Sequence, residues 1–373
     1  MAGVNNEAIS LTSPLHRLIG QAAAKCGGWL PFDRFMAMAL YAPGLGYYAN
    51  ALPKFGSMPQ AGSDFVTAPE MTPLFGQTVA VQVAEALAQT GTREVWEFGA
   101  GSGALAQQLL SALGTSVRRY TIVDVSSSLR ERQQTLLAPF GERVQWLDAL
   151  PQSFEGVVVG NEVLDAMPVK LLQRTNGVWH ERGVMVSGDG FAWEDRATEL
   201  RPPIEMDGEH DYLTEIHLQA EAFIHTLGDR LTRGAALFID YGFGESEYYH
   251  PQRHMGTVMC HRAHVADADP LQAVGHKDIT AHVNFTGIAM AAQDQPLPDA
   301  QAWTVLGYTS QAHFLINCGL LSKMEHSALA ERALAGKLIM EHEMGELFKV
   351  LLLAKGEPWE PCGFTHGDRS HKL

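Results

Sequence analysis

Over residues 94–164, segments with the hydrophobic pattern of buried strands alternate with segments that have the hydrophobic pattern of helices. Short apolar runs typical of buried strands, such as VWEFGAG and GVVVGN, alternate with segments that have the spacing of amphipathic helices. The predicted order is strand 94–101, helix 102–114, strand 119–126, helix 127–141 and strand 156–164, with further strands at 233–242 and 345–356. This rhythm predicts an α/β fold, with a parallel sheet covered by helices.

Residues 72–91 carry strong local signals for a helix. Thr72 is a suitable N-cap, Pro73 suits the first helical position, and Gly91 is a typical stop. The apolar positions that should form one buried face are Leu74, Phe75, Val79, Val83 and Leu87. In the helix 127–141, the segment SSLRERQQ is interpreted as a solvated face with Ser126 as its cap.

Charge and composition narrow the function classes. Among 373 residues, 27 Lys and Arg stand against 42 Asp and Glu, and the formal net charge of −15 opposes binding to nucleic acid or to an anionic membrane. The four cysteines form no CxxC pair, which favours a reducing compartment. No export signal and no apolar stretch of about 20 residues is evident. We therefore expect a cytoplasmic protein without nucleic-acid or membrane partners.

Composition also suggests a division of the chain. Residues 1–71 are expected to form a helix and a loop-rich flap over the active site, because 41–65 is rich in turn-forming residues. Residues 72–373 form the expected catalytic domain, with a lid-like insertion at about 243–340, where the pattern is less regular.

Residues suited to chemistry follow the predicted strands, at the sheet edge where ligands bind in doubly wound folds. Glycines at such a point allow positive φ and a close approach of a ligand to the backbone. The strand ends carry Gly99, Gly101 and Gly103, then Asp124, then Asn161 and Glu162, and finally Asp240 and Tyr241.

These residues alone leave two cofactor classes open. The pattern GAGSGA followed by Asp124 also fits the dinucleotide fingerprint, so a nicotinamide or flavin cofactor is a serious alternative. Glu97, two residues before the first glycine of the loop, favours a ligand that brings positive charge, as S-adenosylmethionine does.

Longer stretches resemble the MidA-like family of S-adenosylmethionine-dependent methyltransferases, which includes a mitochondrial protein arginine methyltransferase that assists complex I assembly. The resemblance covers most of the chain and is carried by GSDFVTAPEMTPLFG, WEFGAGSGALA, GNEVLDAMPVK, FIDYG and GYTSQAHFLINCG. It implies a class I, seven-stranded, mostly parallel Rossmann-like sheet with helical insertions and an N-terminal flap. It also implies S-adenosylmethionine as the cofactor.

The resemblance assigns roles to particular residues. The family's cofactor loop matches Glu97, Gly99, Gly101 and Gly103, and its acidic ribose position matches Asp124, where many members have the longer Glu. Asp148 falls where this fold usually contacts the adenine amino group, and Thr67, Pro69 and Glu70 of the TAPE segment fall above the pocket. The segment NEVLDAMP supplies the expected catalytic residues Asn161, Glu162 and Asp165.

Two neighbouring carboxylates would suit an enzyme that methylates arginine. A guanidinium is a poor nucleophile because its pKa exceeds 12 and its lone pairs are delocalised, and carboxylates can clamp it and stabilise the charge that develops. Glu162 and Asp165 are spaced to form such a clamp. In the alternative interpretation, Asp165 caps the following segment and only Glu162 faces the substrate.

Two function classes remain open. The first is a protein arginine methyltransferase whose partner is a protein with an accessible arginine, such as a subunit awaiting assembly. The second is an S-adenosylmethionine-binding assembly or regulatory factor with weak or no catalysis. Whether the chain forms a homodimer is left open.

The histidines near CHRAH contain no zinc-binding pattern, so no metal is expected. His282, in DITAHVNFT, is retained as a candidate for substrate contact or proton removal.

Overall fold

The computed structural model describes residues 13–50, 67–124, 127–208, 210–262, 265–294 and 302–373, which form two compact units. The parallel-sheet unit comprises Pro53–Met167, His217–His250 and His282–Leu373. The antiparallel-sheet unit comprises Met1–Leu52, Pro168–Ile216 and Pro251–Ala281. Each unit combines separate chain segments, and the expected division into residues 1–71 and a catalytic domain of residues 72–373 stays a prediction.

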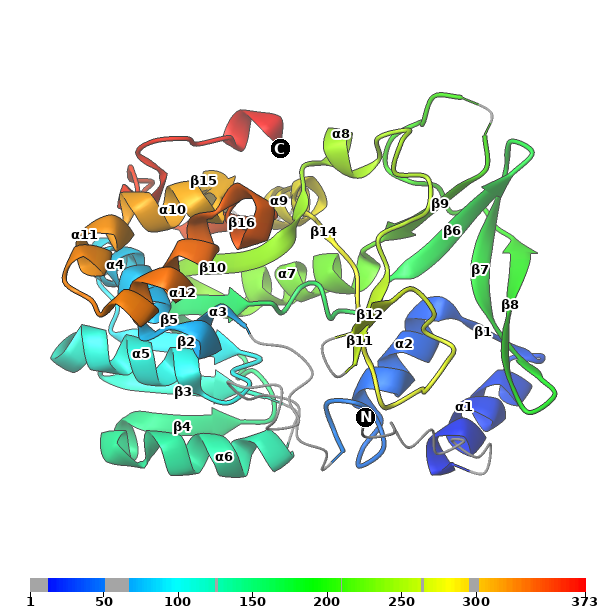
Figure 1. Ribbon diagram of the computed structural model, residues 1–373, viewed down its shortest axis with the longest axis horizontal. Helices are drawn as coiled ribbons and strands as arrows, with labels where there is room; N and C mark the ends of the chain where they lie inside the picture. The colour runs from blue at the N-terminus through cyan, green and yellow to red at the C-terminus, as the bar shows by residue number, and fades with distance from the viewer. Residues whose placement is uncertain (1–12, 51–66, 125–126, 209, 263–264, 295–301) are drawn as a thin grey trace. The chain divides into compact units, whose positions relative to one another are not determined.

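A mixed sheet forms the centre of the parallel-sheet unit (Figure 1). Neighbouring strands from β10 to β4 are parallel, and β16 lies antiparallel between β10 and β15. The short strand β14 (Val283–Asn284) also pairs with the end of β10. The predicted α/β fold with a mostly parallel sheet is therefore confirmed. Across the sheet the strands are β15 (Trp303–Ser310), β16 (Phe348–Lys355), β10 (Leu231–Phe243), β5 (Phe154–Asn161), β2 (Glu94–Phe98), β3 (Arg119–Val123) and β4 (Val144–Leu147).

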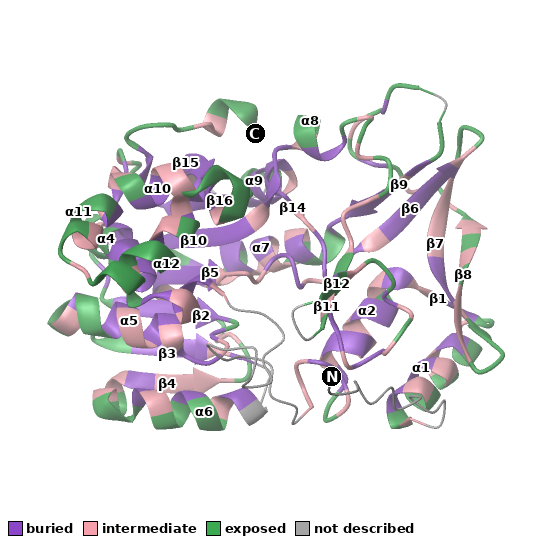
Figure 2. Ribbon diagram, viewed as in Figure 1, coloured by how far each residue is buried: buried purple, intermediate pink, exposed green. Residues whose placement is uncertain are grey.

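Helices cover both faces of this sheet, so successive strand residues enter different cores and both are buried (Figure 2). Val95 and Val157 face one core, whereas Trp96 and Val158 face the other. The first core includes helices α4 (Pro73–Thr90), α5 (Ala104–Leu113), α10 (Gln311–Asn317), α11 (Leu320–Glu325) and α12 (Leu329–Ile339). The second includes α7 (Leu218–Arg230) and α9 (Phe285–Gln293).

The caps predicted for helix α4 are confirmed. The Thr72 hydroxyl accepts a hydrogen bond from the Leu74 N–H at 3.2 Å, and Pro73 opens the helix. Gly91 ends it in the left-handed conformation with φ of 64°. All five apolar positions predicted for its inner face are buried.

The antiparallel-sheet unit is the part of the fold that sequence patterns did not predict. Asn176 and Gly177 both have positive φ and join β6 to β7 as a tight hairpin. Helices α1 (Pro14–Lys25) and α2 (Phe32–Tyr41) pack on β7. The larger sheet contains β1 (Trp29–Pro31), β6 (Lys170–Thr175), β7 (Val178–Ser187), β8 (Gly190–Ala197) and β9 (Tyr212–Ile216), and the smaller contains β11 (Met259–Arg262), β12 (Val265–Asp267) and β13 (Asp278–Thr280).

The predicted flap lies largely outside the described residues, because 51–66 are not among them. The same holds for Ser126, the predicted cap of α6 (Ser127–Leu137). Closure of a flap or lid over the active site stays a prediction.

We expect Gly234→Ala to destabilise the parallel-sheet unit. Gly234 has φ of 149°, and a Cβ there would lie 1.8 Å from the Gly156 carbonyl oxygen on β5. Because the obstacle is backbone, the free energy of unfolding should fall by about 3 kcal/mol or more, measured by urea denaturation. The control is Gly336→Ala in α12, where a Cβ meets nothing within 4 Å and should change stability by no more than about 1 kcal/mol, in the stabilising direction. Equal stabilities for the two variants would contradict this expectation.

Candidate functional site

The strand register brings the predicted site residues to one edge of the sheet. Phe98 pairs with Val123 on one side and with Gly160 on the other, and Asn161 pairs with Ile239. The residues that follow these positions therefore lie beside one another at the carboxyl ends of β2, β3, β5 and β10. This is the edge at which doubly wound folds bind ligands.

The loop after β2 has the backbone of a ligand cradle. Gly99, Gly101 and Gly103 have φ of 61°, 53° and 88°, a backbone region that residues other than glycine rarely adopt. Gly103 also precedes the first turn of α5, so the loop leads into a helix N-terminus, whose N–H groups and dipole favour negative or polar ligand groups.

Glu97 lies beneath this loop and is almost completely buried. Its carboxylate accepts a hydrogen bond from the Tyr120 hydroxyl at 2.7 Å. Burial raises the pKa of Glu97 to about 8, the hydrogen bond from Tyr120 opposes this rise, and the charge of Asp124 adds to it. A ligand cation beside Glu97 would favour its ionised form.

Asp124 is buried at the end of β3, and its Oδ2 accepts a hydrogen bond from the Gln133 side chain at 3.0 Å. Gln133 lies on α6 and has no exposed surface. The interpretation of SSLRERQQ as a solvated face is therefore wrong at this position, although Glu131, Arg132 and Gln134 are exposed. Sequence reasoning missed Gln133 because a single polar residue facing inward leaves no periodic signal.

Asp148, predicted to contact an adenine amino group, is 84% exposed at its side chain. It forms an ion pair with Arg130 of α6. The Asp148 carboxylate is therefore accessible, and most of its surface faces solvent.

The TAPE segment is tied to the helix that follows the glycine loop. Thr67 precedes α3 (Ala68–Met71), and its carbonyl oxygen accepts a hydrogen bond from the Glu70 N–H at 3.0 Å. The Pro69 carbonyl oxygen accepts a hydrogen bond from the Gln108 side chain of α5 at 2.8 Å, and Gln108 in turn accepts one from the Gly76 N–H. The TAPE segment is therefore held against α5 by the Gln108 side chain.

A tight turn after β5 holds the predicted catalytic residues. Glu162 has φ of 53°, which is strained for a residue with a side chain. Its N–H donates to the Ile239 carbonyl oxygen, and its carboxylate accepts a hydrogen bond from the Asn161 amide at 3.0 Å. The N–H groups of the next three residues point toward Oδ2 of Asp240, at 3.0, 2.9 and 3.4 Å, where Asp165 makes the longest of the three contacts.

Three carboxyl groups interact electrostatically in this turn. Burial raises the pKa of Asp165 to about 6, and a hydrogen bond from the Tyr241 side chain opposes this rise. Burial, together with the charges of Asp165 and Glu162, raises the pKa of Asp240 well above its ordinary value. Asp165 and Asp240 have no Lys or Arg ion-pair partner in the described ranges. Acidic groups are thus concentrated here without a matching cation from these residues.

His282 lies close to this turn through Tyr241. Its ring centroid is 5.3 Å from the Tyr241 ring and 5.2 Å from the Phe243 ring. His217, buried and hydrogen-bonded to the Tyr248 hydroxyl at 3.0 Å, has a pKa lowered to about 4 by burial and, to a smaller degree, by His282. The structure therefore brings His282 into the same cluster as Asp165 and Tyr241.

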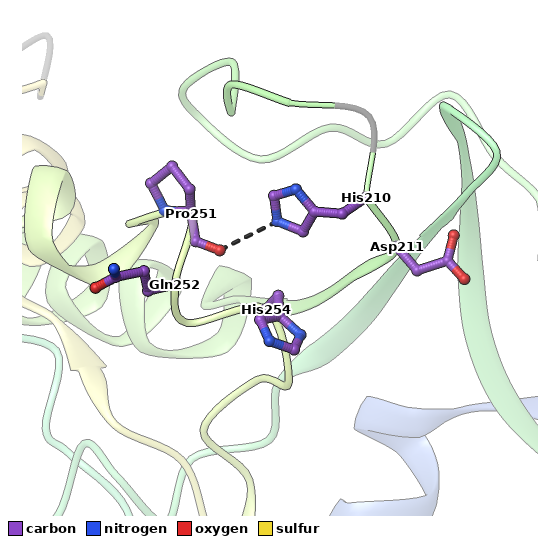
Figure 3. Close-up of a pocket in the computed structure, with 5 residues that line it drawn as sticks. All are labelled: His210, Asp211, Pro251, Gln252 and His254. Atoms are coloured by element: carbon purple, nitrogen blue, oxygen red, sulfur yellow. Dashed lines mark hydrogen bonds between the residues drawn. The ribbon is translucent and has the colours of Figure 1, made fainter.

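Other parts of the molecule offer less. Figure 3 shows an open depression on the antiparallel-sheet unit, where the His210 ring donates a hydrogen bond to the Pro251 carbonyl oxygen at 3.1 Å. None of the predicted site residues lines it. Over the described residues, no group of three or more His, Cys, Asp or Glu could hold a metal ion, and no helix is long and apolar enough to cross a membrane.

The chain is similar to a known protein family and to two solved structures, one of which contains a bound ligand. A family model described as "Putative S-adenosyl-L-methionine-dependent methyltransferase" matches residues 78–302. A crystal structure from Burkholderia thailandensis with bound S-adenosyl-homocysteine is 45% identical, has a TM-score of 0.92 and covers 100% of both chains. A native crystal structure from the same organism is 44% identical with a TM-score of 0.87, again over 100% of both chains.

Curated relatives are more distant. A protein of Caenorhabditis elegans named "Protein arginine methyltransferase NDUFAF7 homolog, mitochondrial" is 27% identical over 79% of this chain and 74% of its own. The human "Protein arginine methyltransferase NDUFAF7, mitochondrial" is 26% identical over 88% of this chain and 81% of its own. The predicted cytoplasmic location is wrong by this comparison, because these relatives are named as mitochondrial proteins.

We expect Glu97→Gln to alter how stability depends on pH in the cofactor-free protein. With a pKa of about 8 in the folded protein against an ordinary value of 4.5, folded Glu97 retains a proton that the unfolded chain releases, so its contribution to stability declines as pH rises between these values. Glutamine can keep the Tyr120 hydrogen bond but does not titrate. Its free energy of unfolding, relative to the parent, should rise by on the order of 1 kcal/mol per pH unit in this window.

Urea denaturation from pH 5 to pH 8 measures the effect, with Glu131→Gln on the exposed side of α6 as the control. If Glu97→Gln and the parent lose stability in parallel across this range, the assignment of a protonated Glu97 fails.

Proposed function

Because this chain belongs to the family of S-adenosyl-L-methionine-dependent methyltransferases whose model spans residues 78–302, we propose that it methylates an arginine side chain of a protein substrate. The MidA-like resemblance is confirmed by this match and by the curated relatives. The cofactor is S-adenosylmethionine rather than a nicotinamide or a flavin, and the reaction is a methyl transfer.

The residues at the strand ends fit this cofactor. The positive φ values of Gly99, Gly101 and Gly103 allow the ligand to approach the backbone, and the buried Asp124 carboxylate suits two ribose hydroxyls. Glu97 suits the cofactor's amino group, and Thr67, Pro69 and Asp148 are further proposed contacts. When bound, the cofactor supplies an electrophilic methyl group on its sulfonium.

The acceptor assignment rests on the turn of residues 161–165 together with Asp240, here called the acidic turn. Oδ1 of Asp165 and Oδ1 of Asn161 are buried, and neither receives a hydrogen bond from any residue in the described part of the chain. Buried acceptors without donors are costly, and this cost is relieved when a donor-rich group binds. A guanidinium has five N–H donors, no acceptor and a permanent positive charge, so it complements these oxygens and the neighbouring Glu162. The names of the curated relatives, which describe them as protein arginine methyltransferases, support the same acceptor.

The turn would act on the guanidinium in two ways. Glu162 and Asp165 would hold two of its nitrogens and stabilise the charge as the third forms a bond to the methyl carbon, while the carbon–sulfur bond breaks and its electron pair stays on sulfur. The attacking nitrogen must also lose a proton. Asp165, with a pKa of about 6, is ionised near neutral pH and is suited to accept it, with His282 as the further candidate.

The partner is proposed to be a protein with an accessible arginine, such as a subunit before assembly. A net charge of −15 would favour encounter with a basic segment at low salt. The alternative is a cofactor-binding assembly factor with weak or no catalysis, and the first experiment below separates these two functions.

Glu162→Gln should separate catalysis from cofactor binding. The substitution keeps the shape and the contact with Asn161 but removes the negative charge that holds the guanidinium. Methyl transfer at saturating cofactor should fall by about 100-fold or more, while the Kd for S-adenosylhomocysteine should change by less than about threefold. Glu155→Gln, at the far end of β5 and paired with Arg233, is the control.

The assay uses labelled S-adenosylmethionine with host lysate, followed by mapping of the labelled residue by mass spectrometry. Absence of transfer by the parent, with cofactor binding intact, would favour the assembly-factor alternative. Full activity of Glu162→Gln would contradict the carboxylate mechanism.

At the mapped site of the substrate, Arg→Lys should abolish methylation. Lysine presents a compact ammonium that cannot bridge two carboxylates as a planar guanidinium does. Methyl incorporation into the two purified substrates is compared by scintillation counting. Equal labelling of the lysine variant, or label found in RNA or small molecules, would contradict arginine specificity while leaving the methyltransferase assignment in place.

A further inference from the structure

One buried side chain connects three consecutive strand ends. Gln133 of α6 donates hydrogen bonds from Nε2 to the Gly101 carbonyl oxygen at 2.9 Å and to Asp124 Oδ2 at 3.0 Å. Its Oε1 accepts a hydrogen bond from the Trp146 indole N–H at 2.9 Å. The loop after β2, the end of β3 and the side chain from β4 thus meet at one amide.

These three partners fix the orientation of the amide. The Trp146 indole nitrogen can only donate and the Gly101 carbonyl oxygen can only accept, so Oε1 must face Trp146 and Nε2 must face Gly101. Both N–H groups of Nε2 are then used, one for the loop and one for Asp124. The amide has no second orientation that satisfies the same partners.

The burial of Gln133 indicates that these hydrogen bonds are the reason for its presence. An apolar residue would fill a fully buried position at a lower desolvation cost, and a buried amide is tolerated only when its polar atoms are paired. Gln133 also packs against the loop, since a Cβ on Gly103 would lie 3.4 Å from its Cγ. An experiment must therefore separate packing from hydrogen bonding.

We propose that Gln133 is a positioning residue that holds the Asp124 carboxylate and the Gly101 peptide in one fixed arrangement for binding the cofactor. This inference rests on the proposed role of Asp124 as the ribose contact. Without the amide, the carboxylate and the loop lose their common anchor, so ligand binding must also supply their ordering. The loss should appear in cofactor affinity and not in the chemical step, because Gln133 lies behind the loop and not at the acidic turn.

The first test compares Gln133→Met with Gln134→Met, its exposed neighbour on the same helix. Methionine keeps the volume and removes all three hydrogen bonds. Calorimetric titration with S-adenosylhomocysteine should show a Kd raised by about 10- to 100-fold for Gln133→Met, as for lost hydrogen bonds to a charged group, and an unchanged Kd for Gln134→Met. The KM for S-adenosylmethionine should rise by a similar factor, with kcat within about threefold of the parent.

The second test gives a pH signature that packing alone would not produce. Gln133→Glu places a carboxyl group where Nε2 now lies 3.0 Å from Asp124 Oδ2, and two buried carboxylates at that separation cannot both ionise. At low pH the introduced carboxyl keeps a proton that can replace the donated hydrogen bond, and at high pH it repels Asp124. The ratio of variant to parent Kd for S-adenosylhomocysteine should therefore increase by about tenfold or more between pH 6 and pH 9.

The results distinguish two failures. A Kd for Gln133→Met equal to that of the parent, or a Kd ratio for Gln133→Glu that is independent of pH, overturns the positioning role. If Asp124→Ala also binds S-adenosylhomocysteine like the parent, the error lies in the assignment of Asp124. If Gln133→Met does not fold, as judged by its thermal unfolding, the pH series on Gln133→Glu decides.

Discussion

The acidic turn depends on one set of hydrogen bonds, which backbone N–H groups of the turn donate to the Asp240 carboxyl group. Asp240 lies near the end of β10 and is almost fully buried, and its Oδ2 accepts hydrogen bonds from the segment after Glu162, which follows the neighbouring strand β5. These bonds satisfy backbone donors of the turn with a single buried acceptor. They offset the strained φ of Glu162 and keep Asp165 beside it. The cost is the burial of two neighbouring carboxyl groups, and this burial raises the pKa values of both aspartates.

The sequence was sufficient to predict the parallel sheet and the edge at which the candidate site residues come together. Strand and helix periods differ clearly between residues 94 and 164, and helix α4 has both of its caps in the sequence. The site edge follows from geometry, because carboxyl ends of parallel strands meet at one edge regardless of the side chains involved. The cofactor could not be chosen from the glycines alone, since positive φ serves dinucleotides equally well. The resemblance and the comparisons made that choice.

What the sequence did not reveal is non-local. Gln133 sits among exposed polar residues of α6, and only its contacts with Gly101 and Trp146 distinguish it from them. The antiparallel sheet of residues 168–216 was also missed, although Asn176-Gly177 is a strong hairpin signal between two strands. That dipeptide alone is sufficient to predict the β6–β7 hairpin. Nothing in the local sequence shows that three separate chain segments combine in one unit.

The position of β16 bears on how the protein is made. This strand is buried along its whole length and lies between β10 and β15, although it comes after both in the chain. Until residues 348–355 leave the ribosome, β10 presents an unpaired edge and β15 has no place in the sheet. Exposed apolar strand edges promote association between chains. The nascent polypeptide therefore exposes an aggregation-prone edge of β10 for as long as residues 348–355 remain unavailable for pairing.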